Sequence, residues 1–499
     1  MTAPLVIVFV VDGLRPDAIS AVDTPAIDRL RAEGVEFLRS HAVVPTVTRV
    51  NATTLVTGVH PGTHGIVGNQ IFIPGVDPRR AIDTASHRRL LEVDRSTNGR
   101  LVRAPTLAER LAAKGLTLAA VSSGSTGSAL LTNHRAPAGV GVLVNGYFDA
   151  GTRVAWPDEA SEAILAKLGP APAKGGGSEA YDAVVTWTQR ALREYVLPEV
   201  RPAAVINWIT EPDHSQHVIG VGSPAARAAL RHADGQIAET VATLDGLGLA
   251  DSTDVIVVSD HGFTTNTAGV DVTAELIEAG LAGSDADAGV VLASSGQAVA
   301  LHVAGREPDR IERIVRFLRS RDWAGALFTA PRAPGDPHGV VEGTFSLELA
   351  HLADPERSPD ILLTFAWTSR ASAFGVAGAD LACVSGGARL FACDHGSMSP
   401  WNVRNTLIAW GPHFKRSVKT RAPAGNVDIA PTILALLGVD ECEGMEGRVL
   451  SEALAGGPDP EHAPVDTRTH VAEAGTYRAA LQLSAANGGH YVDKSWRMP

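Results

Sequence analysis

Short apolar runs separated by longer helical stretches constrain the fold of this chain more than any other feature. The runs cover residues 5–11, 116–123, 203–209, 254–259 and 406–410. Runs of this length are typical of strands that are buried on both faces. The intervening segments 26–33, 106–114, 181–195, 225–247 and 429–437 have helical patterns. This alternation predicts an α/β fold built on a doubly wound, mostly parallel sheet.

One stretch interrupts the alternation and predicts an insertion. Residues 296–330 have the pattern strand, helix, strand, which is typical of a small α+β unit. We therefore expect a core made of residues 1–269 and 386–499, with a cap-like subdomain of residues 270–385 inserted into it. The 499 residues, of which 45% are hydrophobic, suffice for such a core. The final segment alternates like a hairpin that turns near Asn487 and Gly488.

Charge and cysteine content exclude several classes of protein. The net charge of −12 argues against a nucleic-acid polymer as partner, although a small anionic substrate remains compatible with it. The three cysteines form no CxxC pair, which disfavours a disulfide framework and a cysteine zinc site. The first apolar run follows no basic residue and ends at Asp12, so it predicts a strand and no signal peptide. No run approaches the roughly 18 apolar residues of a membrane span, and we expect a cytoplasmic protein.

Acidic residues and histidines follow the predicted strands. Asp12, Asp213 and the pair Asp260 and His261 each come after a strand that should be parallel to the others. In doubly wound sheets, ligands bind beyond the carboxyl ends of the strands. Taken singly, each of these residues could equally cap a helix or bind a turn amide. Together they predict a cluster at one edge of the sheet.

Two further histidines extend this cluster to three aspartates and three histidines. In "EPDHSQH", Asp213 and His217 are four residues apart, and one helical turn would place them on the same side. His395 belongs to a second Asp-His-Gly sequence, "CDHGSMSP". Six carboxylate and imidazole ligands suit two Zn²⁺ ions, and they would also bind Mn²⁺ or iron. Two such ions are a common device for displacement at phosphorus.

The stretch "VVPTVTRVNATTLVTG", residues 43–58, supplies candidate nucleophiles. Capping of a helix is the plain interpretation of its threonines. A helix that begins near Arg49 would also direct free N–H groups at an anion, and a threonine there could attack phosphorus. Thr46, Thr48, Thr53 and Thr54 compete for this role. Thr48 is expected at the N-cap, and Asn51 in the first turn could donate a hydrogen bond to a phosphoryl oxygen.

At this point the sequence resembles the alkaline phosphatase superfamily, and within it the type I phosphodiesterase and nucleotide pyrophosphatase group. The resemblance rests on motifs that occur in the family's order between residues 5 and 438: "VVDGLRPD", "TRVNATTLVTGVHPGTHGIVGN", "EPDHSQH", "VVSDHGF", "DHGSMSPWNVRNTLIAWGPHF" and "NVDIAPTILALLG". The resemblance implies an alkaline phosphatase-like fold and a zinc-dependent hydrolase.

The resemblance also implies a role for each residue of the cluster. One zinc would be surrounded by Asp12, Thr48, Asp260 and His261, and the other by Asp213, His217 and His395. Thr48 would be the nucleophile and would form a phosphothreonine intermediate, which water then hydrolyses. Asn51 would match the phosphoryl-binding asparagine of the family.

The sequence departs from that family next to the nucleophile. Arg49 and Val50 stand where an aromatic residue and a proline are usual, and Ala52 stands where histidine is frequent. Arg49 could reach a second negative group of the substrate, or it could be a solvated side chain at the helix start. Both changes leave specificity for nucleotides open.

The expected activity is hydrolysis of a phosphate diester or pyrophosphate bond in a small anionic substrate. The first alternative is hydrolysis of a phosphonate carbon–phosphorus bond, as in phosphonoacetate hydrolases. A phosphate monoesterase is the second alternative. A sulfatase is disfavoured because Thr48, Arg49 and Val50 do not fit the C/S-x-P-x-R pattern. The oligomeric state is not predicted.

Overall fold

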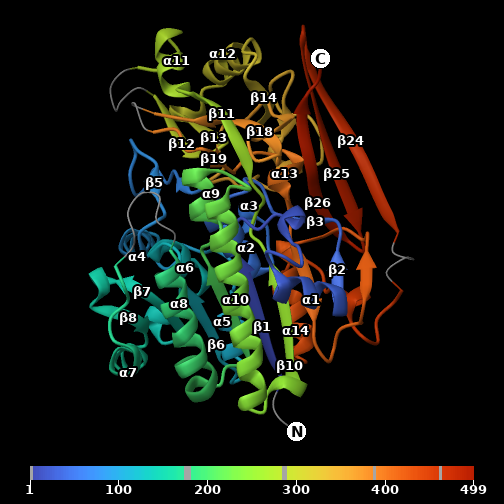
Figure 1. The fold of residues 1–499 in the computed structure, drawn as a ribbon. Coiled ribbons are helices and arrows are strands. Elements are labelled where there is room, and N and C mark those ends of the chain that lie inside the picture. Colours follow the sequence, from blue (N-terminus) through green and yellow to red (C-terminus); the bar gives the residue numbers. More distant parts are fainter. Residues whose placement is uncertain (1–3, 174–180, 284–288, 386–388, 460–463) are drawn as a thin grey trace.

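A nine-stranded sheet forms the centre of the computed structural model, which describes residues 4–173, 181–283, 289–385, 389–459 and 464–499. The strand order is β22 (Val418–Thr420), β2 (Val35–Phe37), β21 (Leu407–Trp410), β10 (Thr253–Val258), β1 (Leu5–Val11), β9 (Ala204–Ile209), β6 (Leu118–Ser122), β7 (Val142–Phe148) and β8 (Arg153–Trp156). Helices lie on both faces of this sheet (Figure 1). The predicted doubly wound α/β fold is therefore confirmed.

The burial of β1 explains why helices are needed on both faces. Every residue of this strand is buried, and successive side chains point to opposite faces. Val6, Val8 and Val10 join a hydrophobic cluster with α2 (Thr48–Thr57), α4 (His87–Ser96), α5 (Leu107–Ala112), α6 (Thr126–Thr132) and α14 (Ile429–Leu436). The alternate residues join a second cluster with α1 (Pro25–Glu33), α7 (Asp158–Leu168), α8 (Asp182–Ala191) and α10 (Pro224–Gly246).

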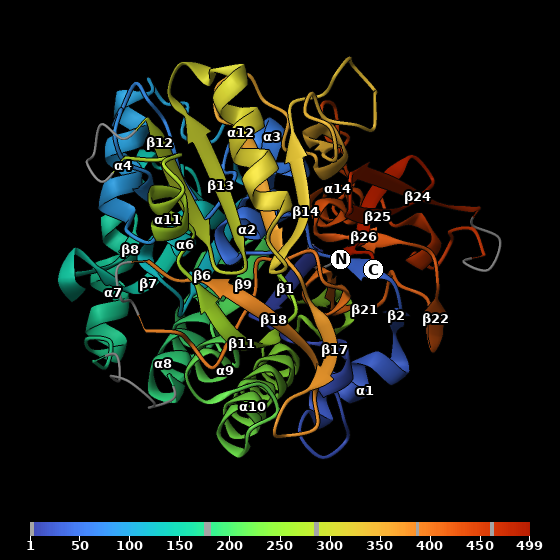
Figure 2. The same ribbon diagram turned by 90° about the horizontal axis from the view of Figure 1, so that it is seen from above.

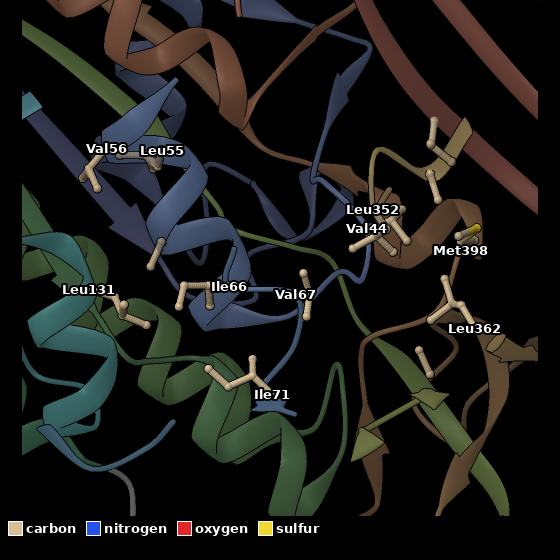
Figure 3. Close-up of a cluster of buried hydrophobic side chains, with 14 of the residues drawn as sticks. Val44, Leu55, Val56, Ile66, Val67, Ile71, Leu131, Leu352, Leu362 and Met398 are labelled. Carbon is tan, nitrogen blue, oxygen red and sulfur yellow. The ribbon is translucent and has the colours of Figure 1, made fainter. Parts of the chain in front are cut away.

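The first cluster is continuous with the region that was predicted as an insertion. Figure 3 shows Leu55 and Val56 on α2 and Leu131 on α6, together with Leu352, Leu362 and Met398 from later segments. All of these side chains are buried. The hydrophobic core thus extends from the main sheet into residues beyond 290.

The strand directions agree with the prediction except at one position. The adjacent strands β10, β1, β9, β6 and β7 are parallel to one another, whereas β21 is antiparallel to β10. The expectation that residues 406–410 form a parallel strand is therefore wrong. The chain returns at the carboxyl end of β10, where Ser259 N–H donates to the Thr406 carbonyl at 3.0 Å. Among the residues described between these two strands, no helix carries the chain to the opposite edge, so β21 runs back along β10.

Strands from between residues 264 and 394 form two further sheets above the carboxyl edge of the main sheet (Figures 1 and 2). The five-stranded sheet has the order β12 (Val290–Ser295), β13 (Ala298–Val303), β16 (Ile361–Phe365), β14 (Ala324–Thr329) and β15 (Phe345–Ser346). The four-stranded sheet has the order β17 (Thr368–Ala371), β18 (Ala377–Cys383), β11 (Thr264–Val270) and β19 (Cys393–Asp394). Helices α11 (Val272–Glu278) and α12 (Pro308–Arg319) accompany them.

The pattern predicted for residues 296–330 corresponds to β13, α12 and β14. The division into a core of residues 1–269 and 386–499 and a subdomain of residues 270–385 stays a prediction. Its first boundary falls at the end of β11, a strand that pairs with both β18 and β19.

The chain ends in a three-stranded antiparallel sheet of β24 (Val465–Ala474), β25 (Tyr477–Ala486) and β26 (Gly489–Arg497). Ala486 pairs with Gly489, so Asn487 and Gly488 form a two-residue turn in which both φ angles are positive, at 50° and 86°. An Asn-Gly pair is favoured there because such turns need two residues that tolerate positive φ. The predicted hairpin is confirmed.

The remaining short α-helices and strands are α3 (Pro61–His64), α9 (Asp213–Ile219), α13 (Pro400–Val403), β3 (Ser40–His41), β4 (Gln70–Ile71), β5 (Ile82–Asp83), β20 (Arg404–Asn405) and β23 (Ala424–Gly425). A π-helix, Leu192–Val200, continues α8, and several 3-10 turns join the other elements. Among the described residues, no helix combines the length and the apolar character that crossing a bilayer requires. The cytoplasmic compartment stays a prediction.

Candidate active site

The predicted aspartates and histidines lie together at the carboxyl edge of the main sheet. Asp12 directly follows β1, and Asp260 follows β10 by two residues. Asp213 is the first residue of α9, which begins just after β9. Because β10, β1 and β9 are parallel, these three carboxylates reach the same edge. His395 enters from above, immediately after β19.

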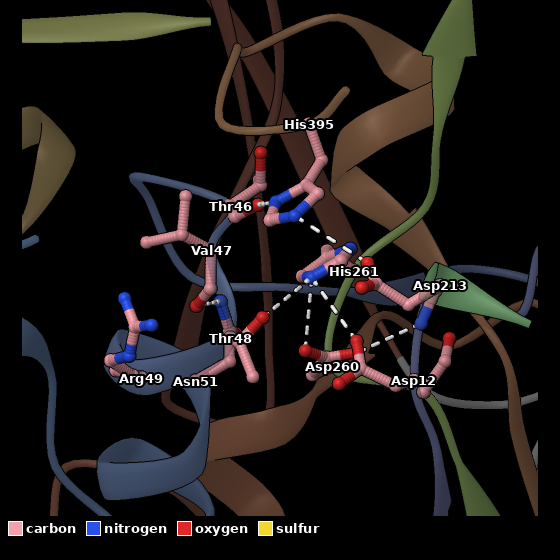
Figure 4. Close-up of polar contacts among 12 residues, drawn as sticks. Asp12, Thr46, Val47, Thr48, Arg49, Asn51, Asp213, Asp260, His261 and His395 are labelled. Carbon is pink, nitrogen blue, oxygen red and sulfur yellow. Dashed lines mark hydrogen bonds and ion pairs between the residues drawn. The ribbon is translucent and has the colours of Figure 1, made fainter. Parts of the chain in front are cut away.

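One group of the cluster surrounds the imidazole of His261. Its Nε2 atom lies 3.0 Å from Oδ2 of Asp260 and 3.5 Å from Oδ1 of Asp12. The hydroxyl oxygen of Thr48 lies 3.3 Å from the same nitrogen. Figure 4 shows these side chains converging on one point from three separate segments.

The second group contains Asp213, His217 and His395. Oδ1 of Asp213 lies 3.4 Å from Nε2 of His217 and 3.6 Å from Nε2 of His395. Asp213 and His217 are one turn apart on α9, as their spacing predicted. A carboxylate oxygen of Asp213 also lies within 4.8 Å of potential ligand atoms of Asp12 and His261. It therefore stands between the two groups, which are further joined by the stacked rings of His261 and His395, 3.6 Å apart.

Asp12 and Asp260 each use one carboxylate oxygen for the protein and leave the other in the cluster. Asp12 Oδ2 accepts the indole N–H of Trp208 at 2.8 Å, and Asp260 Oδ1 accepts the backbone N–H of Gly13 at 3.1 Å. The opposite oxygens, Asp12 Oδ1 and Asp260 Oδ2, are buried and accept no hydrogen bond from any described residue; the same holds for Asp213 Oδ1. Buried carboxylate oxygens without partners are costly, and a cation would satisfy all three.

The imidazoles are oriented in a way that also suits cations. Each Nδ1 atom lies 2.9–3.0 Å from a backbone carbonyl. The carbonyl belongs to Thr46 for His395, to Cys393 for His217 and to Gly262 for His261. Since a carbonyl only accepts, each Nδ1 carries the proton, and in the neutral ring Nε2 presents its lone pair to the cluster. The donor set of oxygen and imidazole nitrogen fits Zn²⁺, Mn²⁺ or Fe²⁺.

The electrostatics of the cluster reflect several buried acids at short range. Burial raises the pKa of Asp12, and the nearby carboxylates of Asp260 and Asp213 raise it further. Burial disfavours the charged form of His217, yet the adjacent Asp213 carboxylate outweighs it and raises the pKa of His217 to about 9. Burial and the neighbouring His261 ring lower the pKa of His395. A bound cation would compete with these protons.

Thr48 is the threonine of its segment whose hydroxyl faces the cluster. It is the first residue of α2, and Val47, with extended φ and ψ, is the N-cap residue. The expectation that Thr48 is itself the N-cap is therefore wrong by one position. The hydroxyls of the other three candidate threonines are engaged elsewhere, at the Ser397 carbonyl (Thr46), the Arg49 carbonyl (Thr53) and the His64 imidazole (Thr54).

Asn51 does not have the position that the sequence suggested. Its side chain is fully buried beneath the first turn of α2. Its amide group donates to the carbonyls of Val43 and Val47 at 3.2 and 3.1 Å, and its oxygen accepts from Val43 N–H and Asn426. The amide hydrogens are thus used within the protein. The expected contact between Asn51 and a phosphoryl oxygen is not compatible with this arrangement.

Asn69 is a candidate that the sequence did not single out. Its side chain is partly exposed beside the first turn of α2, where its Oδ1 accepts the Arg49 N–H at 3.4 Å. It lies in "GIVGN", 21 residues after Thr48, beyond the short helix α3. No periodic pattern connects the two residues, because the intervening turns bring them together.

A cavity of about 470 Å³ opens over the cluster. Its lining includes Asp12, Thr48, Asp213 and His217 from the cluster. The rest of the lining was not predicted, apart from Arg49: Gly124, Ser125, Ser128, Tyr181, Thr210, His214, Val218, Arg389 and Phe391. Rings of Tyr181 and His214 stack 3.8 Å apart in this wall. The volume suits a small-molecule ligand.

Fold and site together define a doubly wound α/β protein with an Asp/His cluster and an adjacent threonine hydroxyl. The family model for type I phosphodiesterase / nucleotide pyrophosphatase matches residues 6–370, well over half of the chain. The protein therefore belongs to the type I phosphodiesterase / nucleotide pyrophosphatase family, as the motifs predicted. His395 lies outside the matched residues.

Individual relatives match a much shorter stretch. A venom phosphodiesterase of Naja atra is 39% identical over 72 residues, which is 14% of this chain and 9% of that protein. Ectonucleotide pyrophosphatase/phosphodiesterase family member 3 of Mus musculus is 37% identical over 71 residues, 14% of this chain and 8% of that protein. The matches thus span less than a tenth of either relative.

Proposed function

We propose that the protein is a hydrolase, dependent on divalent metal ions, that cleaves phosphate diester or pyrophosphate bonds through attack by Thr48. The observation that carries this proposal is the Thr48 hydroxyl, 3.3 Å from Nε2 of His261 and facing carboxylate oxygens that lack hydrogen bonds. The family, and the phosphodiesterase and pyrophosphatase names of its relatives, favour the same bond type.

The metal ligands we propose are those of the two groups. Asp12, Asp260 and His261, with Thr48, would hold one ion, and Asp213, His217 and His395 would hold the other. Zn²⁺ is the preferred ion, with Mn²⁺ or Fe²⁺ compatible with the same donors. Bound ions would lower the pKa of an attacking oxygen and neutralise charge on the phosphoryl oxygens.

The protein's own residues would carry the remaining steps. Thr48, after losing its proton to water, forms a bond from Oγ to phosphorus while the bond to the leaving oxygen breaks, and the leaving oxygen takes up a proton from water. Hydrolysis of the resulting phosphothreonine by water restores the hydroxyl. Backbone N–H groups in the first turn of α2 point toward the developing negative charge. We assign the side-chain hydrogen bond to phosphoryl oxygen to the partly exposed Asn69 in place of Asn51.

The test is hydrolysis of bis-p-nitrophenyl phosphate by metal-loaded protein, compared with p-nitrophenyl phosphate and with phosphate release from phosphonoacetate. We expect the diester to be preferred and Thr48→Ala to lower kcat at least 10³-fold, because the nucleophile is removed. Thr53→Ala is the matched control, since the Thr53 hydroxyl bonds the Arg49 carbonyl within the same helix.

Three outcomes would contradict the proposal. Turnover of the diester that survives Thr48→Ala would exclude attack by this threonine. Faster release of phosphate from phosphonoacetate would identify a phosphonate hydrolase, and preference for p-nitrophenyl phosphate would identify a monoesterase. Metal dependence is checked separately, by elemental analysis of the purified protein and by loss of activity on chelation that Zn²⁺ restores.

A further inference from the structure

Arg49 is a largely buried cation whose charge is only loosely paired. Its side chain is 15% exposed, so the interpretation as a solvated side chain at the helix start is wrong. The carboxylate that pairs with it is Asp83 at 3.9 Å, the outer limit of an ion pair, and Asp83 is itself 68% exposed. The Nε of Arg49 is buried and has no hydrogen-bond partner among the described residues. Buried guanidinium groups normally have close, bidentate partners.

The position of Arg49 relates this cation to the substrate cavity. Arg49 lines the 470 Å³ cavity together with Thr48 and Asp213. Figure 4 shows its guanidinium on the side of Thr48 that faces away from His261 and the carboxylates. A phosphoryl group in position for attack by Thr48 would lie on the His261 side. The guanidinium is therefore placed for a different part of the same ligand.

The charge balance of the cavity points to a negative partner. The two acids in the lining, Asp12 and Asp213, are metal ligands under the proposed function. Bound metal ions would therefore balance their negative charge. The lining cations outside the cluster are Arg49 and Arg389. The hydroxyls of Ser125 and Ser128, 2.8 Å apart, belong to the same lining and can donate hydrogen bonds. Such a wall binds oxyanions better than neutral or cationic groups.

We propose that Arg49 determines specificity by binding a second oxyanion, a carboxylate or a phosphate, on a substituent of the scissile phosphorus group. The preferred substrates would then be small molecules with two separate anionic centres. This inference rests on the proposed function, because it assumes that Thr48 attacks phosphorus in the same cavity.

The experiment uses diesters with the same leaving group and different charge. Phenyl p-nitrophenyl phosphate carries no second anion, whereas its 4-carboxyphenyl and 4-phosphonooxyphenyl analogues each carry one. For the metal-loaded protein we expect kcat/KM to be about 10- to 100-fold higher for a charged diester than for the neutral one, the range typical of a charge-assisted hydrogen bond. The two charged analogues distinguish a carboxylate from a phosphate as the natural group.

Substitution of Arg49 should abolish this preference selectively. In Arg49→Gln we expect kcat/KM for the charged diesters to fall to the value for the neutral diester. The kcat/KM for the neutral diester itself should differ less than threefold from that of the unsubstituted protein. Arg49→Lys should retain part of the preference, because it keeps the charge and loses the planar fork. Arg370→Gln, on the exposed strand β17, is the matched control. If Arg49→Gln fails to fold, as thermal unfolding would reveal, the Arg49→Lys ratio provides the test.

The outcomes separate this inference from the function on which it rests. Equal kcat/KM for the neutral and charged diesters in the unsubstituted protein, with turnover that Thr48→Ala abolishes, would overturn the role of Arg49 alone. A preference that Arg49→Gln and Arg49→Lys both leave intact would do the same. Absence of turnover for all three diesters would overturn the proposed function and this inference with it.

Discussion

The hydrogen bond from Trp208 to Asp12 should control how tightly the cluster binds a metal ion. The indole N–H donates to Asp12 Oδ2 at 2.8 Å, both residues are buried, and the other carboxylate oxygen faces the cluster. The bond thus fixes the carboxylate and favours its ionised form, which is the form that binds cations. Trp208→Phe removes the donor and keeps an aromatic ring at this position in β9.

The size of the expected loss in metal affinity follows from the charge on the hydrogen-bond acceptor, the Asp12 carboxylate. Hydrogen bonds to ionised groups contribute about 1.5–3 kcal/mol, and about 1.4 kcal/mol corresponds to a factor of ten in an equilibrium constant. If the bond stabilises chiefly the metal-binding form of Asp12, Trp208→Phe should weaken metal affinity about 10- to 100-fold. Because burial and the neighbouring acids already raise the pKa of Asp12, loss of this donor makes the protonated form still more competitive with the metal.

The assay is a competition titration of metal-free protein with Zn²⁺ and a chromogenic chelator of known affinity. It measures binding directly, without a substrate. Trp410→Phe is the matched control, because the indole N–H of Trp410 bonds the Glu33 carboxylate at 3.1 Å on the exposed side of the protein. A Kd for Trp208→Phe within twofold of that of Trp410→Phe would refute the reasoning that Asp12 is a metal ligand held by Trp208.

Two further predictions concern stability. Asn51→Ala should lower the free energy of unfolding by about 2–3 kcal/mol, because it leaves several buried backbone and side-chain groups unpaired; a change below 1 kcal/mol in urea unfolding would contradict a structural role. For the metal-free protein, the pKa of His217 is raised from 6.5 to about 9. The protonated form therefore stabilises the fold fully below about pH 6.5, and this contribution disappears as the pH rises through about 9. Urea unfolding across this range should show the decline, and His217→Gln should flatten it; an unchanged slope in that variant would assign the decline to other groups.

The sequence predicted the fold well where the pattern of burial is local. Strand β1 was predicted with its observed bounds, because seven consecutive apolar residues require cover on both faces. The Asn487 and Gly488 turn was predicted because its backbone conformation demands those residue types. The direction of β21 was missed, since an apolar run has the same composition in either direction. The direction of β21 is decided by the short path from α13 to the end of β10, and this path is a property of the tertiary structure.

The Asp/His cluster was predictable for a related reason. Its aspartates follow strands, and once the strands are parallel their carboxyl ends must meet, whatever the loops do. Arg49 and Asn69 differ in this respect. Neither side chain's environment follows from a repeat or from a strand end: the burial of Arg49 depends on the cavity walls, and the approach of Asn69 depends on the turns around α3.

Asn51 shows most clearly where a helical pattern stops being informative. Spacing of three residues correctly places Asn51 on nearly the same side of α2 as Thr48. The helix rises about 1.5 Å per residue, so Asn51 lies about 4.5 Å further along the axis than Thr48. Because α2 points its first turn at the cavity and enters the core behind it, that displacement carries the side chain from the site into the protein interior. Periodicity gives the direction of a side chain around the axis, whereas its depth depends on how the helix is packed. The same 1.5 Å rise leaves Arg49 in the first turn, at the cavity, where its partly buried charge can reach a ligand.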